Sequence, residues 1–239
     1  MKLALTEVQA VASCLGMAVA YVGILYCTPQ RIRALKRDDP LQIQTRFFLL
    51  SVVCALCPLY MLCFYQKSAN DQSFLGWLGF HLDFIAVAKA TALSVLLTMI
   101  LFSGSIFDNF LRLQDMAKAS SWQETIKQTS IYHGFCYERI LAIRTYIFAP
   151  FTEEFVFRSS MAMMLLNAGF SAGTVIFVSP LAFGVAHMHH FIEHIREGRQ
   201  YSQALLIVVF QFCYTSVFGI YAMFIFLRTG QFNAIFAVH

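Results

Sequence analysis

Long apolar segments without a single charged residue constrain the fold more than any other feature of this chain. They cover residues 8–27, 47–65, 90–107, 159–185 and 204–227. Each approaches or exceeds the ~20 residues that a helix needs to cross the hydrocarbon of a bilayer. Hydrophobic residues make up 59% of the sequence and charged residues 13%, whereas soluble domains are about 45–50% apolar and about 25% charged. The sequence therefore predicts an all-α, polytopic integral membrane protein.

The order of these segments predicts a bundle of about six complete transmembrane helices and a shorter seventh. The complete helices are expected at residues 8–27, 47–65, 82–107, 144–167, 171–190 and 203–227. The seventh, at 232–239, has room for about two helical turns. A membrane segment that stops so early would leave the terminal carboxylate in hydrocarbon. We therefore expect a truncated C-terminus, in a fragment or a shortened isoform.

A basic cluster directly after the first helix sets the expected orientation in the membrane. The positive-inside rule places this loop in the cytoplasm and the N-terminus outside; its residues are Arg31, Arg33, Lys36 and Arg37. Alternation of the helices then puts the polar segment 108–139 in the cytoplasm, where its mixed composition suits short amphipathic helices at the interface. No internal repeat or linker divides residues 1–239, which we interpret as one membrane-embedded domain.

The charge balance narrows the choice of partners. The net charge of +4 is modest, and no basic array interleaved with exposed aromatic residues points to nucleic acid. Membrane lipid is the partner that the composition predicts. The seven cysteines are interpreted as free thiols embedded in apolar segments.

The segment FTEEFVFR, residues 151–158, places three charges between apolar runs. Ionisable residues inside a membrane are costly and usually mark a functional site. Glu154 and Arg158 are four residues apart, so they can meet on one face of a helix as an ion pair. Glu153 points about 100° away and has no cation three or four residues further on. We therefore expect Glu153 to act as a catalytic base, although a purely structural network of all three charges stays open.

Three histidines follow in the segment FGVAHMHH, residues 183–190. His187 lies deepest, at the cytoplasmic end of the fifth expected helix, in the same leaflet as Glu153. A single membrane histidine often only bonds neighbouring helices, but beside an uncompensated glutamate it becomes a candidate to position a water molecule. His239, on the short seventh helix, lies about 12 Å from the outer surface at 1.5 Å per residue. It could therefore reach the same cavity.

A competing pattern overlaps these histidines. His190, Glu193 and His194 read H-x-x-E-H, the inverted zinc-protease signature. Zinc catalysis needs a third protein ligand, usually another carboxylate further along the chain, and no Asp or Glu follows Glu197. We expect no metal, and we interpret the segment as a solvated interfacial face. Phe183, His189, His190 and His194 could still line the route of a polar peptide end to the site.

These motifs carry a resemblance to a known family. Glu153-Glu154 with Arg158, and Phe183 with His187, resemble the hallmarks of the abortive-infection superfamily of intramembrane proteases. Within it, the stretches around residues 149–158 and 183–196 look like the type II CaaX prenyl proteases, also called Ras-converting CaaX endopeptidases. The resemblance runs from about residue 10 to the end and is strongest over residues 149–239.

The resemblance implies an activity and roles for the residues. Such enzymes remove the last three residues of farnesylated or geranylgeranylated C-a-a-X proteins, such as Ras-type small GTPases. They work in the endoplasmic reticulum membrane, with an active site open to the cytosol. The resemblance implies that Glu153 is the general base and that His187 holds the water, while Glu154 and Arg158 support the site. It also implies that His239 opens an H-x-x-x-N motif whose asparagine, four residues beyond His239, would stabilise the oxyanion.

Two other classes of protein stay open. One is a catalytically inactive membrane binding protein of the same fold, which the incomplete C-terminal motif makes plausible. The other is a transporter or channel whose buried glutamate and histidine carry ions. The transporter hypothesis is weakened by the single charged cluster and by the lack of inverted repeats in the sequence.

Overall fold

The computed structural model describes residues 2–66 and 73–239. Within these ranges, five helical segments are long and apolar enough to cross a membrane. They are α1 with a 3-10 extension (Glu7–Cys27), α3 (Pro40–Leu62), α5 (Phe84–Leu101), α12 with α13 (Ala172–Arg196) and α14 (Tyr201–Thr229). The polytopic helical architecture expected from the apolar runs is confirmed.

A sixth apolar helix, expected at residues 144–167, is present but changes its winding along its length. It consists of α9 (Arg139–Ile143), α10 (Ala149–Glu153) and α11 (Met161–Asn167), joined by π-helical turns at Arg144–Phe148 and Glu154–Ser160. π-helical turns are rare and often occur at functional sites, and the second one here contains Glu154 and Arg158. The exact number of membrane spans stays a prediction.

Shorter elements connect the long helices. Within the long segments, α1 itself is Glu7–Gly23, α12 is Ala172–Ala186 and α13 is His190–Arg196, with a 3-10 turn at His187–His189. Strands β1 (Lys2–Leu3) and β2 (Tyr65–Gln66) form one antiparallel pair. The remaining helices are α2 (Gln30–Arg33), α4 (Phe74–Trp77), α6 (Ser103–Ala119), α7 (Trp122–Gln128), α8 (Ser130–Tyr137) and α15 (Phe232–Val238).

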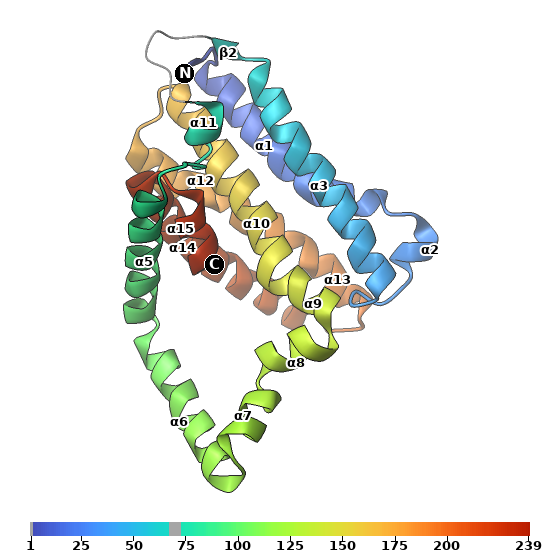
Figure 1. Cartoon of the computed structure of the whole chain (residues 1–239). Helices are drawn as coiled ribbons and strands as arrows, with labels where there is room; N and C mark the ends of the chain where they lie inside the picture. Colours follow the sequence, from blue (N-terminus) through green and yellow to red (C-terminus); the bar gives the residue numbers. More distant parts are fainter. Residues whose placement is uncertain (1, 67–72) are drawn as a thin grey trace.

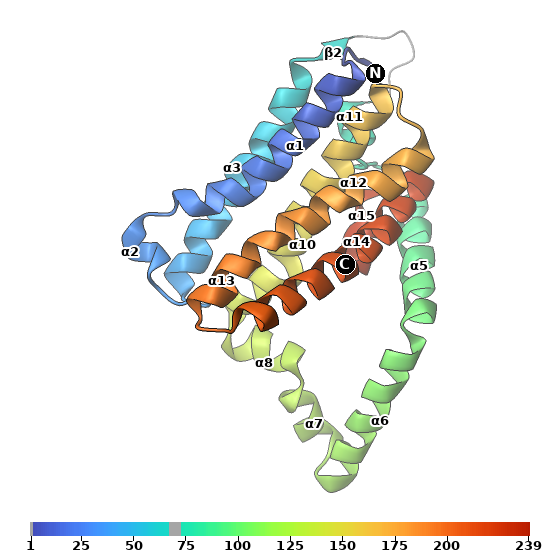
Figure 2. The ribbon, with the colours of Figure 1, turned by 180° about the vertical axis from the view of Figure 1, so that it is seen from behind.

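Figures 1 and 2 show the bundle from opposite sides. Helices α1 and α3 run side by side along one edge, and the column from α9 to α11 lies in the middle. Helix α12 packs against α1 and α14, while α5 forms the opposite edge against α15. Helices α6 and α7 extend below the bundle as an arm that returns through α8. The amphipathic role expected for residues 108–139 stays a prediction.

Local signals set several helix ends, and they explain where the structure departs from the predicted boundaries. Helix α3 begins at Pro40 rather than at residue 47, because the Asp39 side chain accepts a hydrogen bond from the Leu41 backbone N–H at 2.9 Å. Helix α14 ends at Gly230, which adopts a left-handed backbone with φ of 64°. This turn directs α15 back into the bundle, so that the chain ends in its middle (Figure 1).

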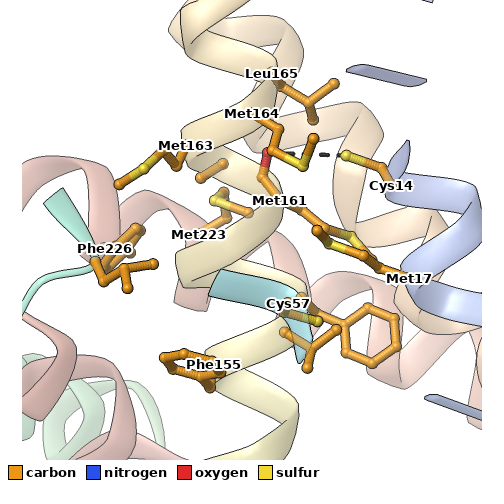
Figure 3. Close-up of a cluster of buried hydrophobic side chains, with 14 of the residues drawn as sticks. Cys14, Met17, Cys57, Phe155, Met161, Met163, Met164, Leu165, Met223 and Phe226 are labelled. Atoms are coloured by element: carbon orange, nitrogen blue, oxygen red, sulfur yellow. Dashed lines mark hydrogen bonds between the residues drawn. The ribbon is translucent and has the colours of Figure 1, made fainter. Parts of the chain in front are cut away.

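Sulfur-containing side chains fill much of the core around α11 (Figure 3). Methionine adapts to irregular gaps between helices, and buried cysteine behaves as a small apolar residue. The core residues of this kind are Cys14, Met17, Cys57, Met61, Met161, Met163, Met164 and Met223. All seven cysteines are free, as predicted. This packing buries residues 161–165 of α11, directly after the second π-helical turn.

Candidate active site

Glu154 and Arg158 form the ion pair that their spacing predicts. Arg158 Nη1 lies 3.1 Å from Glu154 Oε1, and both side chains are buried, with exposed fractions of 1% and 0%. The guanidinium carbon of Arg158 also lies 4.0 Å from the centre of the Phe183 ring. A cation over an aromatic face is stabilised by the ring quadrupole. Phe183, expected along the substrate route, packs on this buried charge and also lines the cavity that holds Glu153 and His187.

His239 completes this cluster from the last residue of the described chain. Its Nδ1 lies 2.6 Å from Glu154 Oε1, and its Nε2 lies 3.6 Å from Glu153 Oε2. Glu154 is therefore held by both Arg158 and His239. The same imidazole ring reaches both adjacent carboxylates, and the bond to Glu154 orients its second nitrogen toward Glu153.

Glu153 differs from Glu154 because it faces open space. Its side chain is 20% exposed and lines a cavity of about 370 Å³ together with His187, His189 and His190. Glu153 and His187, which are expected at one site, both line this cavity, and their catalytic roles stay predictions. His239 contacts Glu153 from the side but is not among the residues that line this cavity.

A backbone contact orients the ring of His187. Its Nδ1 lies 2.8 Å from the carbonyl oxygen of Phe183, and a carbonyl can only accept a hydrogen bond. Nδ1 therefore carries the proton, and in the neutral ring Nε2 is left as an acceptor. The edge of the Phe183 ring packs on the imidazole at 4.6 Å between ring centres. The Nε2 atom of His187 can therefore accept a hydrogen bond from a water molecule in the cavity.

The H-x-x-E-H histidines do not converge as the zinc pattern requires. His190 Nδ1 bonds Glu193 at 2.8 Å, whereas His194 Nδ1 faces Glu197 at 3.5 Å. In the described part of the chain, the one group of possible metal ligands is His189, His190 and Glu193, with ligand atoms within 4.8 Å of one another. His194 lies outside this group.

Two arginines lie close to Glu193, the acid of that group, and would compete with a metal ion for it. Arg37 Nη1 lies 3.5 Å and Arg46 Nη2 lies 4.0 Å from the Glu193 carboxylate. A divalent cation bound there would lie next to two guanidinium groups, which would repel it. The absence of a metal from the reaction stays a prediction.

The sequence interpretation missed the arginines of the cavity. Arg37, Arg46 and Arg144 all line it, together with Tyr21, whose hydroxyl bonds Thr152 Oγ1 at 2.8 Å. Basic residues near the ends of apolar runs are read as markers of topology, so Arg37 is used for orientation alone, and Arg46 and Arg144 are given no role in the sequence interpretation. Arg46 is the informative case, because it lies inside helix α3 rather than in a loop.

An apolar groove of about 630 Å³ adjoins the cavity. It lies between α1, α11 and α12 and is lined almost entirely by aliphatic and small side chains, including Ala18, Ala182 and Leu165. Val22, Ala186 and His189 line both the groove and the cavity. The two spaces therefore adjoin at these residues, and a ligand with an apolar chain and a polar end could extend from one toward the other.

Comparison with known proteins shows which sequences this chain resembles. Residues 135–239 match a family described as type II CAAX prenyl endopeptidase, Rce1-like. The chain is 34% identical to CAAX prenyl protease 2 of Arabidopsis thaliana, over 96% of this chain and 77% of the relative. It is 38% identical to CAAX prenyl protease 2 of Homo sapiens, over 92% of this chain and 65% of the relative. The protein of that name in Saccharomyces cerevisiae is 29% identical over 90% of this chain and 72% of the relative. No solved structure is significantly similar.

Proposed function

Because the chain belongs to the family of Rce1-like type II CAAX prenyl endopeptidases, we propose that it hydrolyses prenylated C-a-a-X proteins and releases their last three residues. The observation that carries the mechanism is the difference in contacts between two adjacent glutamates. Glu154 forms an ion pair with Arg158 and a hydrogen bond with His239, whereas Glu153 faces the cavity. Only Glu153 therefore has a carboxylate free to act on a substrate.

In the proposed reaction, Glu153 takes a proton from a water molecule in the cavity. His187 Nε2 accepts the second hydrogen of that water and holds it for attack on the scissile carbonyl. The proton is then delivered to the nitrogen of the leaving tripeptide. His239 keeps its Nε2 beside the Glu153 carboxylate through its bond to Glu154. Donors aimed at the oxyanion would supply further stabilisation of the transition state.

The prenyl chain is expected to enter the apolar groove between α1 and α12. The groove adjoins the cavity at Val22, Ala186 and His189, so an isoprenoid in it would place the modified cysteine next to Glu153. Membrane lipid would occupy the same groove in the absence of substrate. The groove supports a lipid-modified substrate over a soluble peptide or an inorganic ion.

The location and the range of substrates belong to the same proposal. We place the protein in the endoplasmic reticulum membrane, with the cavity open to the cytosol, where Ras-type small GTPases are processed. The arginines at the cavity are consistent with this orientation by the positive-inside rule. We propose that the reaction proceeds without a metal, because Glu153, His187 and His239 provide the required groups.

The test is release of the terminal tripeptide from a farnesylated C-a-a-X peptide by membranes that contain the full-length protein. Glu153→Gln and His187→Ala should each lower kcat about 100-fold or more, since general acid–base groups contribute about 10²–10⁴-fold. Glu124→Gln, an exposed acid on α7, is the matched control and should keep full activity. Undiminished cleavage by Glu153→Gln would exclude the mechanism. Loss on chelation with recovery on added zinc would favour the metal alternative instead.

A further inference from the structure

Three arginines line one cavity with the proposed catalytic groups. Arg37 precedes α3, Arg46 lies within α3, and Arg144 begins the first π-helical turn of the central column. The side chains of Arg46 and Arg144 are only 22% and 21% exposed. Like charges gathered in a poorly solvated space repel each other unless anions neutralise them.

Among the residues that the structure describes, two carboxylates, of Asp38 and Glu193, lie within 4.0 Å of these three cations, and the Glu153 carboxylate lines the same cavity without pairing with any of them. Asp38 holds Arg144 at 2.9 Å, and the Arg37 carbonyl accepts a second bond from Arg144 at 3.1 Å. Glu193 is shared, because Arg37 lies at 3.5 Å from its Oε2 and His190 lies at 2.8 Å from the same oxygen.

Arg46 is the least satisfied of the three. Its nearest carboxylate oxygen is Glu193 Oε1 at 4.0 Å, which is beyond hydrogen-bond distance. In the part of the chain that the structure describes, its side chain makes no hydrogen bond. One guanidinium that lines the cavity therefore has free donors and only a distant counter-charge.

We infer that Arg46, supported by Arg37 and Arg144, binds the free carboxylate at the C-terminus of the substrate. This inference rests on the proposed function, in which the leaving tripeptide ends in that carboxylate. Guanidinium and carboxylate match as a planar, bidentate pair, which is stronger and more directional than a lysine contact. The bound anion would also balance the positive charge of the cavity.

This contact would set the position of the cut. Three extended residues span roughly 10 Å, so a carboxylate anchored at Arg46 holds the bond three residues upstream at a fixed place in the cavity that Glu153 lines. The protein would measure its cleavage site from the substrate's C-terminus, while the prenyl group holds the other side of the bond. In a substrate whose C-terminus is neutral or displaced, the bond to be cut would no longer be held at this place.

The experiment compares two farnesylated peptides that differ only at the C-terminus, one with a free acid and one with an amide. For the unmodified protein, kcat/KM should be about 10- to 100-fold higher for the acid, as expected for a charged hydrogen bond in a poorly solvated site. In Arg46→Gln this ratio should fall to about one, mainly through a higher KM for the acid, while cleavage of the amide stays near its original rate. Arg46→Lys should keep only part of the preference for the free acid, because a lysine ammonium cannot form the bidentate contact of a guanidinium.

The amide peptide also reports whether Arg46→Gln is folded, since its cleavage does not use the proposed contact. Arg31→Gln, on α2 and outside the cavity, is the matched control and should leave both rates unchanged. An equal fall in both rates, or an unmodified protein indifferent to the amide, would overturn the inference and leave the proposed function intact. A lipid phosphate as the true anion would give the first of these results. Failure of the unmodified protein to cleave either peptide would instead refute the proposed function.

Discussion

Replacing Arg158 by methionine is expected to destabilise the protein severely, because the change leaves Glu154 without its main counter-charge. Both side chains are almost completely buried, and their charged atoms lie 3.1 Å apart. Removing one partner of a buried ion pair costs about 3–5 kcal/mol, since the remaining charge has neither water nor a counter-ion. His239 still contacts Glu154 at 2.6 Å and keeps the cost within this range, although the cation over the Phe183 ring is lost as well.

The size of the effect can be measured by thermal unfolding in detergent. For a domain of this size, each kcal/mol lowers Tm by roughly 2–4 °C, so Arg158→Met should lower Tm by about 6–20 °C. The double variant Glu154→Gln/Arg158→Met removes both charges and should be more stable than Arg158→Met alone, because no buried charge is left unpaired. Lys127→Met, which breaks the exposed pair with Glu124 on α7, should leave Tm unchanged.

Two results would refute this reasoning. If Arg158→Met unfolds at the same temperature as the unmodified protein, the pair contributes no net stability. If the double variant is less stable than the single one, Glu154 stabilises the fold even without Arg158, through its contact with His239, and is not an unpaired charge. Activity measured on the same samples separates stability from catalysis, because the double variant should fold and still cleave poorly: His239 loses the carboxylate that orients it.

Two further predictions concern close packing and the apolar groove. A methyl group at Gly219 would lie 2.7 Å from Pro180 Cβ and 3.1 Å from Arg158 Nη2. Gly219→Ala should therefore displace α14 from α12 and lower both Tm and kcat. Unchanged values of Tm and kcat would show that the two helices separate easily. Ala182→Phe should fill part of the groove and raise KM for a farnesylated peptide about tenfold, since each displaced CH₂ costs about 0.8 kcal/mol. Geranylgeranylated substrates should suffer more than farnesylated ones, and an equal effect on both, or no effect on either, would place the prenyl chain elsewhere.

Features that depend on neighbours along the chain were predictable from the sequence. The apolar runs predicted membrane helices because the thickness of the bilayer sets a length that one segment must meet by itself. The pairing of Glu154 with Arg158 followed from their spacing, since residues four apart share a helix face. The same geometry singled out Glu153 as the carboxylate without a local partner, and the structure places it at the cavity.

Features that depend on packing between distant segments were decided only by the tertiary structure. The bond from His239 to Glu154 joins residues 85 positions apart, and it exists because the turn at Gly230 directs α15 into the bundle. Arg46 lines the cavity only because α3 packs beside the central column of α9 to α11. The sequence by itself determined which residues could carry charge inside a membrane. The packing of the helices determined which of those charges are neutralised and which are left facing a substrate, because an ion pair between segments forms only where the folded chain brings its partners together.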